Sequence, residues 1–176
     1  PLQAVAAPRA ELPPRRPDAP ACRGDAGSRP WREYAERSDR FAARLASLPL
    51  PAGERVAVML PDGPGVHVAF VGCEKAGLVV MGIGPRAGRD EIRHLLKRSA
   101  ARAFVTRPTL RDADTRKLVA DLRSEGLSID HHVVVDGQLG PDDACYATDP
   151  PPALATTVAA LVTRVAGWRA MKPRSP

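Results

Sequence analysis

The chain has 176 residues, of which 44% are hydrophobic and 26% charged, which suits a single domain with a hydrophobic core. Its net charge is +6, but aromatic residues make up only 4%, and acidic residues interrupt most of the arginine-rich stretches. We therefore expect no nucleic-acid partner. No apolar run approaches the roughly 18 to 20 residues that a membrane-spanning helix needs.

The first residues have neither an initiator methionine nor the basic start of a signal peptide, so we expect the chain to begin inside a longer protein. Its cysteines, Cys22, Cys73 and Cys145, are far apart, and no Cys-x-x-Cys pair occurs. This usage argues against a disulfide framework and favours a reducing, cytoplasmic location.

The first 30 residues contain many prolines and show no hydrophobic period, so we expect an irregular lead-in over residues 1–30. From Trp31, hydrophobic residues recur at steps of three and four as far as Leu48. This spacing predicts an amphipathic helix, which Pro49 and Pro51 end.

The middle of the chain alternates short apolar segments with helical patterns. Strands are predicted at 55–60, 78–81, 103–106 and 132–135. Helices are predicted at 66–76, 89–99 and 110–124. The strands are apolar throughout rather than alternating, so both faces of the sheet should be covered. The order predicts an α/β fold: a three-layer parallel sheet with right-handed βαβ crossovers.

A glycine-rich turn, Gly82-x-Gly84-x-x-x-Gly88, follows the second predicted strand and precedes a helix. Dinucleotide-binding fingerprints occur in this setting, and Arg107 after the next strand would suit the 2′-phosphate of NADP. Two features argue against this interpretation: the spacing has one residue too many, and Pro85 lacks the N–H that a phosphate would need. An NADP-binding Rossmann domain nevertheless remains an alternative.

A longer sequence pattern favours a different interpretation from NADP binding. The segment Trp31–Leu45, followed by Gly53–Asp62, resembles the opening of the adenylate-forming (AMP-binding) enzymes, in which such a helix leads into a strand of the form G-D-R-V-A-V-x-L-x-N. Glu74–Met81 is similar to the family's K-A-G segment, and Pro85–Leu96 to the turn and helix that follow it. The order and separation of these pieces agree over residues 11–149. The chain therefore resembles the N-terminal part of an acyl-CoA synthetase.

This resemblance implies that residues 31–149 are part of the large N-terminal α/β domain of such an enzyme. Residues 150–176 are then a tail that does not match the family. It implies activation of a small-molecule carboxylate as acyl-AMP and transfer to CoA, with ATP, Mg²⁺ and CoA as cofactors of the parent protein. The family's phosphate-binding loop and late lysine are not found, so no catalytic residue is assigned and the chain alone should be inactive. A non-catalytic nucleotide- or partner-binding remnant is the alternative.

One candidate cofactor contact follows from the resemblance. In relatives, the turn equivalent to Gly84 and Pro85 lies near the CoA entrance, which implicates Arg86 as well. One predicted helical face carries four cations at steps of three, four and four: Arg86, Arg89, Arg93 and Lys97. This face is either a landing site for CoA phosphates or a solvated surface. No metal site is predicted, since His131 and His132 have no acidic or thiol partners at ligand spacing.

Overall fold

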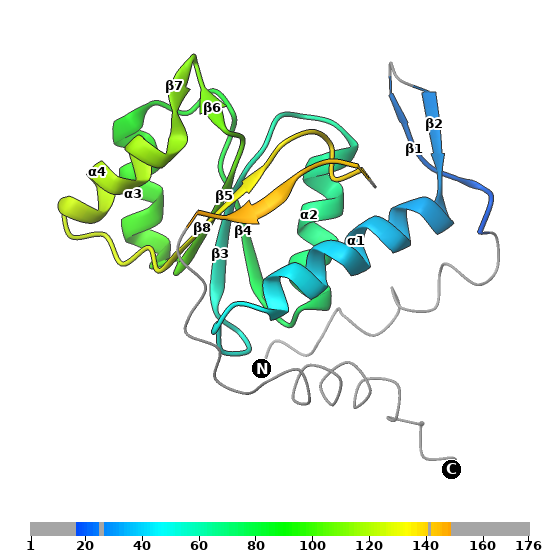
Figure 1. The fold of residues 1–176 in the computed structure, drawn as a ribbon, viewed down its shortest axis with the longest axis horizontal. Coiled ribbons are helices and arrows are strands. Elements are labelled where there is room, and N and C mark those ends of the chain that lie inside the picture. Colours follow the sequence, from blue (N-terminus) through cyan, green and yellow to red (C-terminus); the bar gives the residue numbers. More distant parts are fainter. Residues whose placement is uncertain (1–16, 25–26, 141, 149–176) are drawn as a thin grey trace, which may run out of the picture.

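The computed structural model describes residues 17–24, 27–140 and 142–148 (Figure 1). Its helices are α1 (Trp31–Ala46), α2 (Pro64–Lys75), α3 (Arg89–Ser99) and α4 (Thr115–Ser124). Its strands are β1 (Pro20–Gly24), β2 (Gly27–Pro30), β3 (Arg55–Met59), β4 (Val79–Gly82), β5 (Ala103–Thr106), β6 (Thr109–Leu110), β7 (Ala113–Asp114), β8 (His131–Val135) and β9 (Cys145–Ala147).

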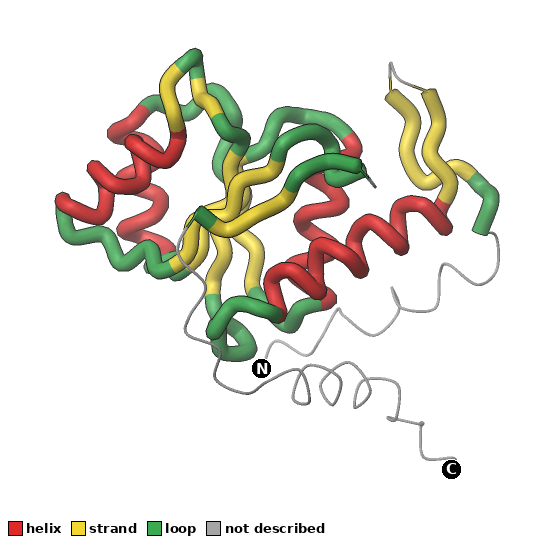
Figure 2. Tube along the Cα trace, viewed as in Figure 1, coloured by secondary structure: helices red, strands yellow, loops and turns green. Residues whose placement is uncertain are grey.

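The centre of the fold is a five-stranded sheet in the order β4-β3-β5-β8-β9. The first four strands are parallel, and β9 pairs antiparallel with β8 at one edge. Helices α1 and α2 pack on one face, and α3 and α4 on the other (Figures 1 and 2). The predicted three-layer α/β fold with a parallel sheet is confirmed.

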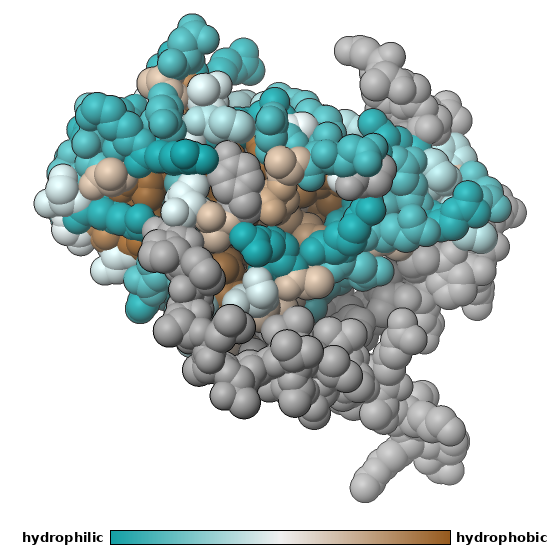
Figure 3. Space-filling model, in the orientation of Figure 1, coloured by the Kyte–Doolittle hydropathy of each residue, from teal (hydrophilic) through white to brown (hydrophobic). Residues whose placement is uncertain are grey.

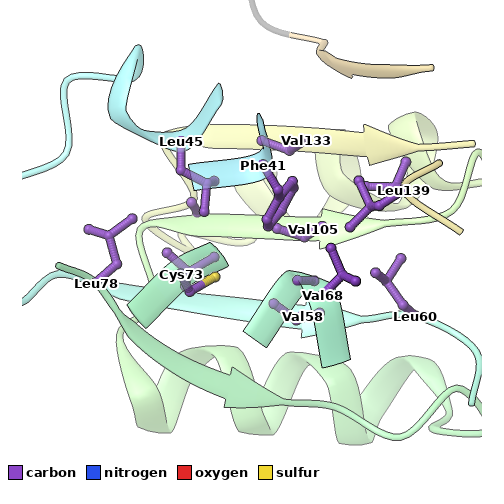
Figure 4. Close-up of a cluster of buried hydrophobic side chains, with 14 of the residues drawn as sticks. Phe41, Leu45, Val58, Leu60, Val68, Cys73, Leu78, Val105, Val133 and Leu139 are labelled. Atoms are coloured by element: carbon purple, nitrogen blue, oxygen red, sulfur yellow. The ribbon is translucent and has the colours of Figure 1, made fainter. Parts of the chain in front are cut away.

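Two hydrophobic clusters, one on each face of the sheet, form the core. In the first, Phe41 and Leu45 of α1 pack with α2 against Val58, Val105 and Val133 of the strands (Figure 4). The second joins the other face of the same strands to α3 and α4. Since β3, β5 and β8 supply side chains to both faces, their apolar sequences have no polar alternation.

The contact between α1 and α2 depends on a small residue. A Cβ atom at Gly72 would lie 2.7 Å from Cδ1 of Phe41, so the two helices approach too closely for any side chain there. Lys75 then ties the helices together at the surface: its ammonium donates to the Ser38 hydroxyl at 2.8 Å and pairs with Asp39 at 2.8 Å.

The predicted strands and central helices are confirmed, with two differences. Residues 109–114 form a β-hairpin rather than the start of a helix, and α4 begins only at Thr115. The reason is local: the Asp114 carboxylate accepts from the Arg116 N–H and caps α4, while Arg111 and Asp112 take the left-handed conformation of a tight turn. Of the lead-in expected over residues 1–30, the structure describes 17–24 and 27–30, where β1 and β2 are extended and pair antiparallel.

Hydrophilic residues cover most of the face seen in Figure 3, and hydrophobic colour appears mainly between the helices, where the sheet lies. Among the described residues, the exposed large hydrophobic side chain is Val79, at 51%. It lies on β4, the outer strand of the sheet. No helix within the described part of the chain is long and apolar enough to span a membrane.

Candidate functional site

The carboxyl ends of the parallel strands form the edge at which open α/β sheets bind ligands, usually where the strand order reverses. Here the crossover through α2 leads from β3 to β4 on one side, and the next crossover, through α3, leads to β5 on the other side of β3. The reversal therefore lies between β3 and β5. The N-terminus of α2 and the loops after β5 and β8 meet at this place.

Beside the reversal, at the β4 end of the same edge, is an open cleft of about 310 Å³. Its floor is apolar, with Leu60 and Ile83 buried, and Phe70 lies at its wall. Of the residues predicted to lie near CoA, Gly84 and Pro85 line this cleft, whereas Arg86 does not. The exposed Arg86 contributes its backbone carbonyl, which accepts a hydrogen bond from Arg111 of the β6–β7 turn.

The predicted basic face of α3 is partly neutralised within the fold. The Arg89 guanidinium donates to the Glu125 carboxylate at 2.6 Å, and Arg93 lies 3.9 Å from the other oxygen of that carboxylate. Glu125 is the residue that ends α4. Both arginines are about half exposed, so these pairs join α3 to α4 at the surface and contribute little to stability.

The glycine-rich turn does not have the backbone of a tight phosphate-binding turn. Among the described glycines, those with positive φ are at 53, 63, 77, 126 and 137, so Gly82, Gly84 and Gly88 are not among them. The turn follows the outer strand β4 rather than a strand at the reversal. Arg107, the suggested contact for a 2′-phosphate, instead donates to the Gly137 carbonyl and lies 3.9 Å from the Asp136 carboxylate.

The reversal itself is occupied by the loop that follows β8. The Gly65 N–H, in the first turn of α2, donates to the side-chain oxygen of Gln138 at 3.0 Å. The Gln138 backbone carbonyl accepts from Arg37 of α1, which is only 5% exposed and also pairs with Glu33. The end of α2 that would otherwise attract an anion is thus satisfied by a neutral side chain from the same chain.

Asp143 organises this loop. Its carboxylate accepts hydrogen bonds from the backbone N–H groups of Gly140, at 2.7 Å, and Gln138. The Gly140 bond is the main reason that the pKa of Asp143 lies below its usual value; burial opposes the shift, while the Gln138 bond and the charges of Arg37 and Arg107 add to it. Sequence reasoning missed Gln138, Arg37 and Asp143, because the decisive contact spans 73 residues and leaves no local pattern.

A second cluster of polar contacts surrounds His132, the second residue of β8. His132 is fully buried: its Nε2 lies 2.8 Å from the Thr106 hydroxyl, and its Nδ1 lies 3.2 Å from the Thr148 hydroxyl. The Thr106 hydroxyl in turn contacts that of Thr115 at 3.1 Å, at the start of α4. These contacts satisfy a buried imidazole and join β8 to β5, to α4 and to Thr148, the residue after β9.

No metal site appears in the part of the chain that the structure describes, and the thiols of Cys73 and Cys145 have raised pKa values. No group of three or more metal-ligating side chains occurs there. Burial raises the pKa of the Cys73 thiol to about 12, with a smaller contribution from Glu74. Burial also raises the pKa of Cys145 to about 11, against the opposing charge of Arg44. Both thiols therefore stay protonated at neutral pH.

Known proteins with similar sequences include a salicyl-AMP ligase and long-chain-fatty-acid–CoA ligases. The chain is 33% identical over 123 residues to a salicyl-AMP ligase/salicyl-S-ArCP synthetase of Mycobacterium tuberculosis, covering 66% of this chain and 22% of that protein. It is 40% identical over 76 residues to a long-chain-fatty-acid–CoA ligase of Escherichia coli, covering 43% of this chain and 14% of the ligase. The chain thus spans less than a quarter of the length of these curated relatives.

Solved structures with the same fold include apo MatB from Rhodopseudomonas palustris, with a TM-score of 0.60 at 20% identity over 73% of this chain and 24% of that one. A benzoate CoA ligase from Burkholderia xenovorans gives 0.58 at 27% identity over 74% and 25%. The family model for the AMP-binding enzyme matches residues 10–167. That match passes the boundary expected at 149, which stays a prediction because residues 149–176 lie outside the described part. The chain belongs to the AMP-binding enzyme family, with the fold found in the N-terminal domain of adenylate-forming enzymes.

Proposed function

We propose that this chain is the N-terminal part of an ATP-dependent acyl-CoA synthetase that acts in the cytoplasm. The parent enzyme joins a small-molecule carboxylate to AMP with release of pyrophosphate, then transfers the acyl group to the thiol of CoA. The observation that carries this proposal is the family match over residues 10–167, on a fold that covers about a quarter of the solved CoA ligases. ATP, Mg²⁺ and CoA are the cofactors of the parent.

The acyl acceptor has a second candidate. The relative that matches the greater length is described as a salicyl-S-ArCP synthetase, whose named product is a thioester of a carrier rather than of CoA. An aryl-acid ligase that loads a carrier protein is therefore a second proposal. The two proposals differ chiefly in the thiol that accepts the acyl group.

The deciding experiment concerns the gene and then the protein. The DNA after the codon for Thr148 is translated in all three frames, and we expect a Ser/Thr-Gly-rich loop ending in Pro-Lys-Gly, followed by a late lysine. The longest such polypeptide is assayed for pyrophosphate release with MgATP, a panel of carboxylates, and either CoA or a carrier protein. The 176-residue chain alone should give none. Absence of the loop from every frame would favour the alternative of a non-catalytic binding remnant.

For the parent enzyme, we also propose that Gly84, Pro85 and Arg86 lie near the CoA entrance. Two of the three line the open cleft, and the exposed Arg86 follows them directly in sequence with a positive charge that would suit a phosphate of CoA. Arg86→Ala should raise KM for CoA about fivefold while leaving KM for ATP unchanged, which corresponds to about 1 kcal/mol. Arg98→Ala, near the C-terminal end of α3, is the matched control. Equal effects of both variants would reject the assignment.

A further inference from the structure

We propose that residues 137–140 form a latch that closes the strand-order reversal of the sheet by holding Gln138 against the first turn of α2. Asp143 keeps the latch shut. The latch is a conformational device of this part of the fold and does not depend on which ligase the parent enzyme is. A ligand that enters between β3 and β5 has to displace it.

The fit between the latch and α2 is close enough to require glycine. A Cβ atom at Gly65 would lie 2.8 Å from the Gln138 side-chain oxygen and 3.1 Å from its Cα atom. Because that second contact is with the backbone, no rotation of the glutamine would relieve it. A Cβ atom at Gly63 would also meet the Gln138 oxygen, at 3.2 Å. Both glycines of this turn therefore face Gln138 of a loop more than 70 residues away.

The closed latch has a strained backbone. Gly137 has φ +97°, which glycine tolerates, but Leu139 has φ +59°, which costs energy for a residue with a Cβ atom. Leu139 is only 6% exposed and lies at the same end of the core cluster as Leu60 and Val68 (Figure 4). Burial of the Leu139 side chain thus stabilises a backbone conformation that is unfavourable by itself. A latch needs such a balance between one favourable and one unfavourable energy.

The remaining contacts that hold the latch are charged. Asp143 accepts from the N–H groups of Gln138 and Gly140, which lie on either side of Leu139. The charged groups that face Asp143 are Arg37, paired with Glu33 on α1, and Arg107 after β5, which lies near Asp136. On the side of α2, the group that meets the loop is the Gly65 amide. Neutralising or removing Asp143 therefore weakens both bonds that shape the latch.

Amide hydrogen exchange of the full 176-residue chain, followed by NMR, tests the proposal at the Gly65 N–H. A latch opens without unfolding the sheet, so Gly65 should exchange faster than the core amide of Val58 and with little dependence on denaturant. Gln138→Ala should reduce the protection of Gly65 roughly tenfold, because its hydrogen-bond acceptor is lost. Gln138→Glu keeps the acceptor oxygen and adds a negative charge at a helix N-terminus, so protection should be kept or increased.

Two outcomes would overturn the latch. One is exchange of Gly65 only through global unfolding, with the denaturant dependence of Val58, since the loop would then be part of the core. The other is equal loss of protection in Gln138→Ala and Gln138→Glu, since the oxygen acceptor would then be irrelevant. Gly88→Ala, at a glycine with no atom within 4 Å of the added Cβ and a φ of −78°, controls for the substitution itself.

Discussion

The two ends of the carboxyl edge of the sheet differ in a way that the topology alone would not suggest. At the outer strand β4, the edge opens into a cleft lined by Gly84 and Pro85. At the reversal between β3 and β5, where ligands usually enter such sheets, Gln138 fills the space over Gly65. In this part of the fold, the loop that contains Gln138 occupies the usual ligand position. The open cleft lies one strand away, beside β4.

The difference follows from the chemistry of the two turns. The turn after β4 contributes Gly84, which has no neighbour within 4 Å of an added Cβ and is exposed. The first turn of α2, which follows β3, contributes Gly65, which is buried under the backbone of another loop. A glycine therefore means open space in one turn and close packing in the other, and its sequence context does not distinguish the two cases.

Gly65→Ala should produce the largest effect, since it forces a methyl group against a backbone atom 3.1 Å away. Overpacking of this kind typically costs about 1 to 3 kcal/mol, which we expect as a loss in the free energy of unfolding measured with urea. The matched change at the other end of the edge, Gly84→Ala, should alter that free energy by less than about 0.5 kcal/mol. Equal losses in the two variants would contradict the contrast between the closed and open ends.

Asp143→Asn should have an intermediate effect, because it weakens the two hydrogen bonds that shape the loop at the closed end. We expect a loss of about 1 kcal/mol at pH 7. The pKa of Asp143 is lowered in the folded protein, so its stabilisation is present above the unfolded carboxyl pKa of about 3.9 and is lost as the pH falls through the folded value.

The pH dependence of two amide resonances in this loop tests whether the Asp143 carboxylate holds it. In the unmodified chain, the Gly140 and Gln138 amide resonances should shift as the pH falls from about 5 towards the lowered pKa of Asp143. In Asp143→Asn these two resonances should not titrate, while amides elsewhere behave as before. Titration of the same two amides in the variant would show that another carboxyl group holds the loop.

Most of the central fold could be predicted from the sequence, because its strands are apolar without interruption and its helices carry a clear hydrophobic stripe. The bounds of α3 and β5 agree with the prediction at both ends. The hairpin at 109–114 could not be predicted from periodicity, since a helix that continued back to Leu110 fits the same pattern. Its signal was Asp114, a favoured N-cap residue directly before the helix.

The candidate site was less accessible to sequence reasoning. The glycine-rich turn at 82–88 drew attention because it resembles a phosphate-binding motif, yet the residue that faces the reversal is Gln138, in a loop without any such motif. The burial of Arg37 is also unpredictable from its helix, where its neighbours in sequence are the polar residues Glu36 and Ser38. Contacts of this kind depend on tertiary approach, which one sequence does not encode in a local pattern.

Val79→Thr should have the smallest effect of the three and tests whether the outer edge of β4, at its amino-terminal end, is exposed in solution. Val79 is 51% exposed on the outer strand β4, and threonine keeps its β-branched shape and its preference for strands. We expect a change of less than about 0.5 kcal/mol in the free energy of unfolding by urea. Val105→Thr is the matched control: Val105 is fully buried in β5, so the hydroxyl would lack solvent and cost about 1 to 3 kcal/mol. A large effect at Val79 would mean that the outer edge of β4 is covered in solution.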